Sequence, residues 1–114
     1  MKRFMISFNN GDMKFDPSEL DAVAAEAHAV LRDAKAEGVW LFGGGFWGDI
    51  SHTVNENGEV RPGPIAPSDV RLGGFCVIEV ATADEAYVWA ARNAKACRCD
   101  QEVREMMYDP ESTN

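Results

Sequence analysis

The sequence lacks a long hydrophobic run and has few basic side chains. No stretch approaches the ~18–20 apolar residues of a membrane-spanning helix, and residues 1–8 hold no apolar run of signal length. Lysine and arginine number 11 against 19 acidic residues, so the formal net charge is −8. The longest basic run is the pair at residues 2–3, too little to neutralise nucleic-acid phosphates. We therefore expect neither a membrane nor a nucleic-acid partner.

Paired cysteines and the common catalytic signatures are also missing. The three cysteines leave an odd count, which argues against a disulfide framework and favours reduced thiols in the cytoplasm. The C-x-C of residues 97–99 lacks the second ligand pair of a zinc site. The glycines at 43–45 lack the Lys-Ser/Thr ending of a phosphate-binding loop. No metal and no cofactor is expected.

The residues that are present describe one ordinary folded domain. The 114 residues fall within the usual size of a single domain, ~100–150 residues. Hydrophobic residues make up 46% and charged residues 26%, the balance of a soluble globule. We expect one domain over residues 1–114.

The pattern of apolar residues predicts two β-α-β units joined by a hairpin. A capping box at 16–19 and a stop at Gly38 bound a helix over about 17–37. A second capping box at 82–85 opens another helix, whose inner stripe includes Trp89 and Asn93. Strands are predicted at 3–8, 39–42, 52–54, 59–61, 74–80 and 102–107. Between and after them, the sequence predicts a proline-rich loop at 62–71 and a frayed tail at 109–114.

This order, βαβ(hairpin)βαβ, is typical of a ferredoxin-like α+β fold, an antiparallel sheet with two helices on one face. The three glycines at 43–45 are too flexible for a strand interior and indicate a bulge or a close backbone approach. The second sheet face would have no helix over it. Because a bare apolar sheet face is rare on monomers, we expect a homodimer that packs sheet to sheet.

Four motifs stand out in this order, namely Leu72–Phe75, Val77–Val80, Asp84–Ala86 and Trp89–Arg92. Together they resemble the YCII-related family, particularly its DGPF-motif branch. The resemblance implies a dimeric α/β barrel, in agreement with the strand order. The motif that names the branch is altered, because residues 62–65 are Pro-Gly-Pro-Ile. A function that rests on the lost aspartate cannot be carried over.

The resemblance also implies acid–base chemistry. Some YCII-related proteins resemble enzymes with a histidine on the first helix and an aspartate beyond the second strand, and His28 and Asp49 occupy those places. The family includes a dehydrochlorinase acting on chlorinated hydroxyquinones. Elimination or isomerisation of a cyclic, oxygenated small molecule would fit this pair. The alternative is a non-catalytic dimeric module that binds a metabolite or has a regulatory role.

Helix geometry gives an independent reason to consider His28. It lies about 100° from the centre of the apolar stripe, at the edge of the expected helix–sheet contact. A histidine there can line a pocket and exchange protons near neutral pH, although a purely structural or surface role is equally open. Asp12, which follows the first strand, is a rival to Asp49 as its partner.

Three further residues are candidates for ligand binding. Phe46 and Trp47 could form aromatic walls of an apolar pocket, which would suit a ring-shaped ligand. His52 opens the hairpin, and strand alternation could point it toward the same cavity. For each of the three, a role in the core, the dimer contact or the sheet surface is the alternative.

Overall fold

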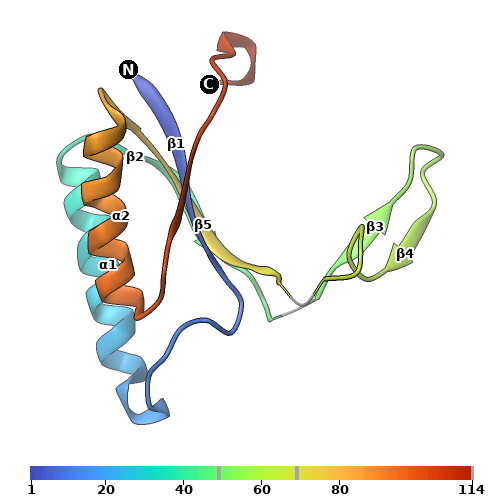
Figure 1. The fold of residues 1–114 in the computed structure, drawn as a ribbon, viewed down its shortest axis with the longest axis horizontal. Helices are drawn as coiled ribbons and strands as arrows, with labels where there is room; N and C mark the ends of the chain where they lie inside the picture. Colours follow the sequence, from blue (N-terminus) through green and yellow to red (C-terminus); the bar gives the residue numbers. More distant parts are fainter. Residues whose placement is uncertain (49, 69, 114) are drawn as a thin grey trace.

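The computed structural model of the chain describes residues 1–48, 50–68 and 70–113. Two helices cross one face of a four-stranded antiparallel sheet, and a separate two-stranded sheet stands apart from them (Figure 1). The main sheet has the order β2-β5-β1-β6: β2 (Trp40–Gly45), β5 (Leu72–Val80), β1 (Lys2–Asn9) and β6 (Glu102–Glu105). The remaining elements are α1 (Leu20–Ala36), α2 (Ala83–Cys97), β3 (His52–Val54) and β4 (Val60–Pro62). The predicted ferredoxin-like α+β fold is confirmed.

The first helix begins and ends where the local chemistry requires. The Asp16 carboxylate accepts the N–H of Ser18 at 3.0 Å, and the Glu19 carboxylate accepts the N–H of Asp16 at 3.3 Å. This capping box satisfies backbone donors that a helix start leaves unpaired. The first turn, Pro17–Glu19, is a 3₁₀ helix, so the expected α-helix begins three residues late. Gly38 follows the end of α1 with φ +74°, a conformation that favours glycine.

The second helix is capped at its start and tied to the first helix at its end. The Thr82 hydroxyl accepts the N–H of Glu85, and the Glu85 carboxylate accepts the N–H of Ala81 at 2.9 Å. Arg98 caps the other end in the left-handed region, with φ 61°. Its guanidinium donates to carbonyls of the last helical turn and to the Glu26 carboxylate on α1. The two helices are therefore joined by an ion pair as well as by packing.

The hydrophobic core lies between the helices and the sheet. Along β5, buried residues alternate with half-buried ones, and the buried set faces the helices. Trp89 and Ala86 pack on this layer from α2, so the expected core position of Trp89 is confirmed. The core consists of Phe4, Ile6, Ala34, Cys76, Ile78, Val80, Ala86, Trp89 and Ala90. The buried strand residues come from β1 and β5, the two central strands, and those of β2 and β6 are only partly buried.

The opposite side of the main sheet, which we call the open face, is not packed against a helix. The strand residues that alternate with the core residues lie here, among them Met5 and Val77. Phe42 is paired with Val77 and is 66% exposed. The Arg3 guanidinium donates to the Glu79 carboxylate at 2.9 Å on the same side of the sheet. The open face is therefore apolar at its centre and carries an ion pair toward one end.

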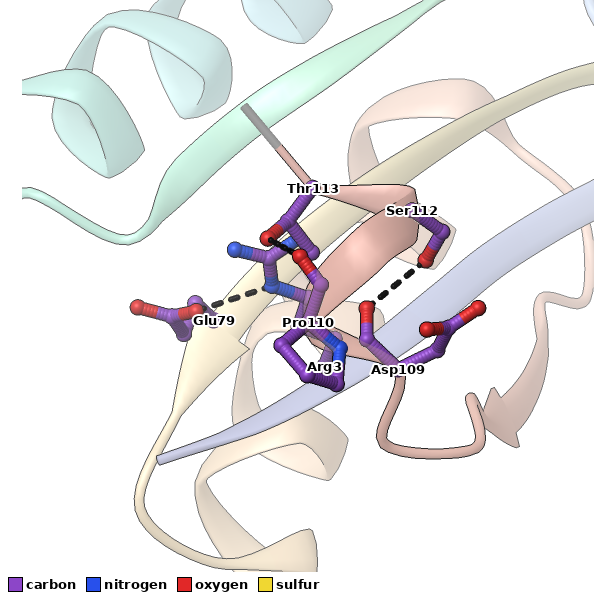
Figure 2. A network of polar contacts seen from close by, with 6 residues as sticks. All are labelled: Arg3, Glu79, Asp109, Pro110, Ser112 and Thr113. Carbon is purple, nitrogen blue, oxygen red and sulfur yellow. Dashed lines mark hydrogen bonds and ion pairs between the residues drawn. The ribbon is translucent and has the colours of Figure 1, made fainter.

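The C-terminal residues differ from the expected frayed tail. β6 ends at Glu105, and Asp109 then caps a 3₁₀ turn over Pro110–Ser112. Figure 2 shows this turn beside the Arg3–Glu79 ion pair. A bond from the Thr113 hydroxyl to the Pro110 carbonyl closes the turn. The segment therefore forms a local turn, held by hydrogen bonds within itself, where a frayed tail was expected.

The glycine run was assigned wrongly as unsuited to a strand interior, because Gly43 and its two successors complete β2. The expected bulge is present one step earlier: Trp40 lies opposite Ile78 and Phe42 opposite Val77, so one extra residue is accommodated between them. The expected close approach is also confirmed. A Cβ at Gly43 would lie 2.5 Å from the Phe75 carbonyl oxygen.

Replacing Gly43→Ala should therefore destabilise the fold, because β2 and β5 would have to separate. We expect a loss of about 1–3 kcal/mol in the free energy of unfolding, as for overpacked sites. Gly44→Ala is the matched control, since nothing lies within 4 Å of a Cβ there, and it should change stability by less than about 0.5 kcal/mol. Urea denaturation followed by circular dichroism measures both, and equal stabilities would contradict the close approach.

Candidate functional site

A cavity of about 230 Å³, which we call the helix–sheet cavity, opens where the two helices meet the glycine-rich end of the sheet. Its apolar wall includes Phe8, Leu31 and Trp40, so Trp40 is a lining residue as well as a partly buried one. Two amide side chains, Asn93 and Gln101, contribute polar groups. The titratable lining residues are His28, Cys76 and Cys97. No Asp, Glu, Lys or Arg is among the described lining residues.

Glycines on two strands shape the end of this cavity. A Cβ at Gly74 would lie 2.8 Å from the ring of Phe8, and one at Gly73 would lie 2.9 Å from it. Phe8 can therefore lie flat against the backbone of β5 as part of the wall. Gly44 and Gly45 line the cavity from β2. The missing side chains leave space that ordinary strand residues would fill.

His28 lies on α1, where it is exposed to solvent and lines the helix–sheet cavity. Among the described residues, none donates to or accepts from its imidazole. Asp49, the partner that the family resemblance implies, lies outside the described residues. Asp12, the rival partner, lines a different cavity together with Lys14 and Arg98. The structure thus brings His28 to a cavity but does not bring Asp12 to the same one.

The two thiols of the cavity are held in their protonated form. Burial raises the pKa of Cys76 to about 11, although the Asn93 amide, which donates to its sulfur at 3.7 Å, acts in the opposite direction. Burial also raises the pKa of Cys97, against the lowering effect of the Arg98 charge. A thiol with a raised pKa stays protonated near neutral pH and is therefore a poor nucleophile. Neither cysteine therefore provides thiolate chemistry here.

The ligand-binding candidates lie elsewhere. Phe46 is 54% exposed and its ring stacks on Phe75 at 6.0 Å. It lines a second cavity, of about 460 Å³, together with His52 and residues that flank the hairpin. Trp47 is 91% exposed and is not among the described lining residues of either cavity. The structure thus places Phe46 and His52 together, but separately from His28.

Sequence reasoning missed the polar part of the helix–sheet cavity. Asn93 was assigned to the inner stripe of α2 without a role, yet its amide reaches the cavity. The available signal was a polar residue within an otherwise apolar stripe. Gln101 carried no such signal, because it follows the last helix in an irregular segment.

Two other kinds of site are absent from the described part of the chain. No group of three or more His, Cys, Asp or Glu side chains there could hold a metal ion. No described helix combines the length and the hydropathy needed to cross a bilayer.

Comparison with known families gives a match over most of the chain. The model of the family described as "YCII-related domain" matches residues 3–106. The matched region includes the main sheet except the first residue of β1, both α-helices and all residues of the helix–sheet cavity. A search of curated proteins found no match.

The raised thiol pKa values predict slow alkylation of the folded protein. At pH 8, iodoacetamide should modify Cys76 at least about tenfold more slowly than a free cysteine, because less thiolate is present and the group is buried. Unfolding in urea should remove the difference. Peptide mass spectrometry over a time course measures each cysteine separately. Alkylation of native Cys76 at the rate of free cysteine would contradict the assigned environment.

Proposed function

The chain belongs to the YCII-related domain family, and from that premise we propose that its helix–sheet cavity binds a small, weakly charged organic molecule with which His28 exchanges a proton. An elimination or isomerisation of a cyclic, oxygenated compound fits this proposal best. The cavity would act without a resident cofactor.

The observation that carries the proposal is the identity of the titratable groups on the cavity wall. Carboxylates, ammonium groups and guanidinium groups are absent from its described lining, and the two thiols have raised pKa values. Imidazole is the side chain that ordinarily changes charge between pH 5 and 8. His28 is therefore the one described lining group suited to acid–base work near neutral pH.

The same lining indicates the kind of ligand. Without a cation on the described wall, a carboxylate or phosphate would lose its hydration and gain no charged partner. The volume of about 230 Å³ is below the ~300–1,000 Å³ of pockets for drug-sized ligands. Aromatic and aliphatic side chains such as Phe8, Trp40 and Leu31 favour an apolar ring. A neutral, single-ring molecule with a few oxygen substituents meets these conditions.

Asn93 would recognise an oxygen of that ligand. In the structure its amide donates to the Cys76 sulfur at 3.7 Å, and sulfur is a weak acceptor. A ligand carbonyl or hydroxyl oxygen would be a stronger acceptor for the same N–H. If the Asn93 N–H donated to a ligand oxygen and no longer to the Cys76 sulfur, binding would be favoured and the amide would keep a partner.

A proton transfer can then be written with the groups on the wall. Neutral His28 would take a proton from a carbon next to a ligand carbonyl, and the electron pair of that C–H bond would move toward the carbonyl oxygen. Return of the proton to another carbon completes an isomerisation. In an elimination, the electron pair returns from the oxygen to form a double bond between the α and β carbons, the β-substituent departs with its own bonding pair, and His28 releases the proton to solvent. One positioned base contributes about 10²–10⁴-fold to such a reaction. Asp49 would orient the imidazole.

The alternative is binding without turnover, and it would rest on the surroundings of His28. Its ring is exposed, and no described side chain fixes its orientation. A general base usually has a partner that sets its tautomer. On this alternative the cavity recognises a metabolite, and the dimer passes on the signal.

We also propose that the protein works as a homodimer through the open face. Phe42 is 66% exposed there and lies beside half-buried Val77. An apolar surface of this kind on a sheet is usually covered in a functional assembly.

A substitution that fills the helix–sheet cavity should weaken ligand binding without unfolding the protein. Ala27→Leu adds bulk to the wall of the helix–sheet cavity, whereas Ala25→Leu adds the same bulk at an exposed position of α1 that is not on the wall. With phenol as the probe, saturation-transfer NMR should give a signal for the native protein and for Ala25→Leu. The signal should fall by at least about fivefold for Ala27→Leu, because the added side chain occupies the ring position.

Benzoate, an anionic molecule of similar size, tests the charge argument in the same experiment. It should give little or no transfer, because the described wall offers no cation. Equal signals for phenol in both leucine variants would contradict binding in this cavity. A stronger signal for benzoate than for phenol would contradict the neutral ligand class.

A further inference from the structure

The hairpin β3–β4, which we call the arm, stands apart from the other described helices and strands of its chain. β3 and β4 pair with each other, and no other described helix or strand packs against either of them. Figure 1 shows the arm extending well away from the main sheet. A two-stranded hairpin on its own is only marginally stable in water. The arm therefore needs an external surface to hold it.

One side of the arm is apolar and unoccupied. Val54 lies directly opposite Val60, and these two side chains are 60% and 65% exposed. The other side is tied to the loop that follows. Thr53 donates to the Gly63 carbonyl at 2.9 Å, and Arg61 donates to two loop carbonyls at 3.0 and 3.1 Å. The valine side is consequently the one left for a partner.

The surface area indicates how large that partner contact is. The chain exposes 8286 Å², whereas a compact monomer of 12.5 kDa exposes about 6,200 Å². The excess of about 2,000 Å² is more than twice the ~800 Å² that each partner contributes to a standard interface. The radius of gyration, 15.7 Å, likewise exceeds the ~13 Å of a compact chain of this length. The chain is thus more extended than a compact monomer of its length.

The arm and the open face lie on the same side of the molecule. Figure 1 shows α1 and α2 on one side of the main sheet and the arm extending from the other. A partner that covers Phe42 on the open face would therefore also lie alongside the arm. A second copy of the chain provides both an apolar sheet face and an apolar arm in equal number, so a two-fold pair can cover all four surfaces at once.

We propose that the arm docks on a second copy of this chain, and that the two arms of a dimer each hold the opposite subunit through the side that carries Val54 and Val60. The inference goes beyond the proposed function, since it concerns the hairpin and not the helix–sheet cavity. Each chain has a formal charge of −8, so the contact must rest on apolar burial and should tighten with added salt.

Two single valine-to-aspartate substitutions test whether the arm contributes to the dimer contact. Val60→Asp changes the arm, and Val88→Asp changes α2, where the valine is 61% exposed. Both add one negative charge and remove one exposed valine. Sedimentation equilibrium at several concentrations should give the native protein as a dimer of twice 12.5 kDa. Val60→Asp should raise the dimer Kd by at least about tenfold, and Val88→Asp by less than about threefold.

A third variant separates the arm from the sheet contact. Phe42→Glu places a charge on the open face and should also weaken the dimer. Suppose that Phe42→Glu raises the dimer Kd, whereas Val60→Asp and Val88→Asp have the same dimer Kd as each other. The arm then has no role in dimerisation, and the proposal is overturned. A native protein that is monomeric at every concentration, or an arm that binds a different protein in place of a second copy, overturns it as well.

Hydrogen exchange provides a readout that does not depend on a variant. The backbone N–H of Asn55 donates to the Glu59 carbonyl, and that of Gly63 donates to the Ser51 carbonyl. Both amides should be protected at concentrations where the dimer forms, and should lose protection on dilution below the Kd. Protection that is independent of concentration would show that the arm is stable without a partner, against the proposal.

Discussion

Two helices can cover only one face of the four-stranded sheet, and the rest of the structure depends on that constraint. The core forms where α1 and α2 lie on the sheet, and its largest fully buried side chains include Ile6 and Ile78. The other face keeps exposed apolar groups such as Phe42. The arm extends on the same uncovered side, and the chain exposes more surface than a compact protein of its mass. A single chain thus has a packed core on one side of its sheet and exposed apolar side chains on the other.

The glycines of β2 and β5 connect this architecture to the candidate site. Gly43 lets the two strands approach closely, and Gly74 leaves room for the ring of Phe8. Gly44 and Gly45 line the cavity with bare backbone. Residues that would weaken an isolated strand therefore provide both close strand packing and an open space beside His28. The helix–sheet layer makes this space apolar, and the imidazole on α1, the reactive group of the proposed function, lines it.

Features that depend only on residues close together in the sequence were predictable. The caps at Asp16 and Thr82 act within a few residues, and apolar periodicity located both helices and the strands of the sheet. The glycine strand was not predictable in the same way, because its need for glycine comes from contact with β5. His28 could be placed at the edge of a helix from its angle alone. Asn93 was missed because its significance lies in its distance to Cys76.

The position of the arm explains why Phe46 and His52 do not line the same cavity as His28. His52 and Phe46 were expected beside the same pocket as His28, but the chain leaves the main sheet after β2 and carries His52 away on the hairpin. The two histidines therefore report on different parts of the molecule. The most direct test of ligand binding beside His28 is an NMR titration in which phenol is added and the signals of both imidazoles are followed. The account predicts a saturable shift of the His28 ring signals and none for His52, whereas an unchanged His28, or equal shifts of both rings, would contradict it.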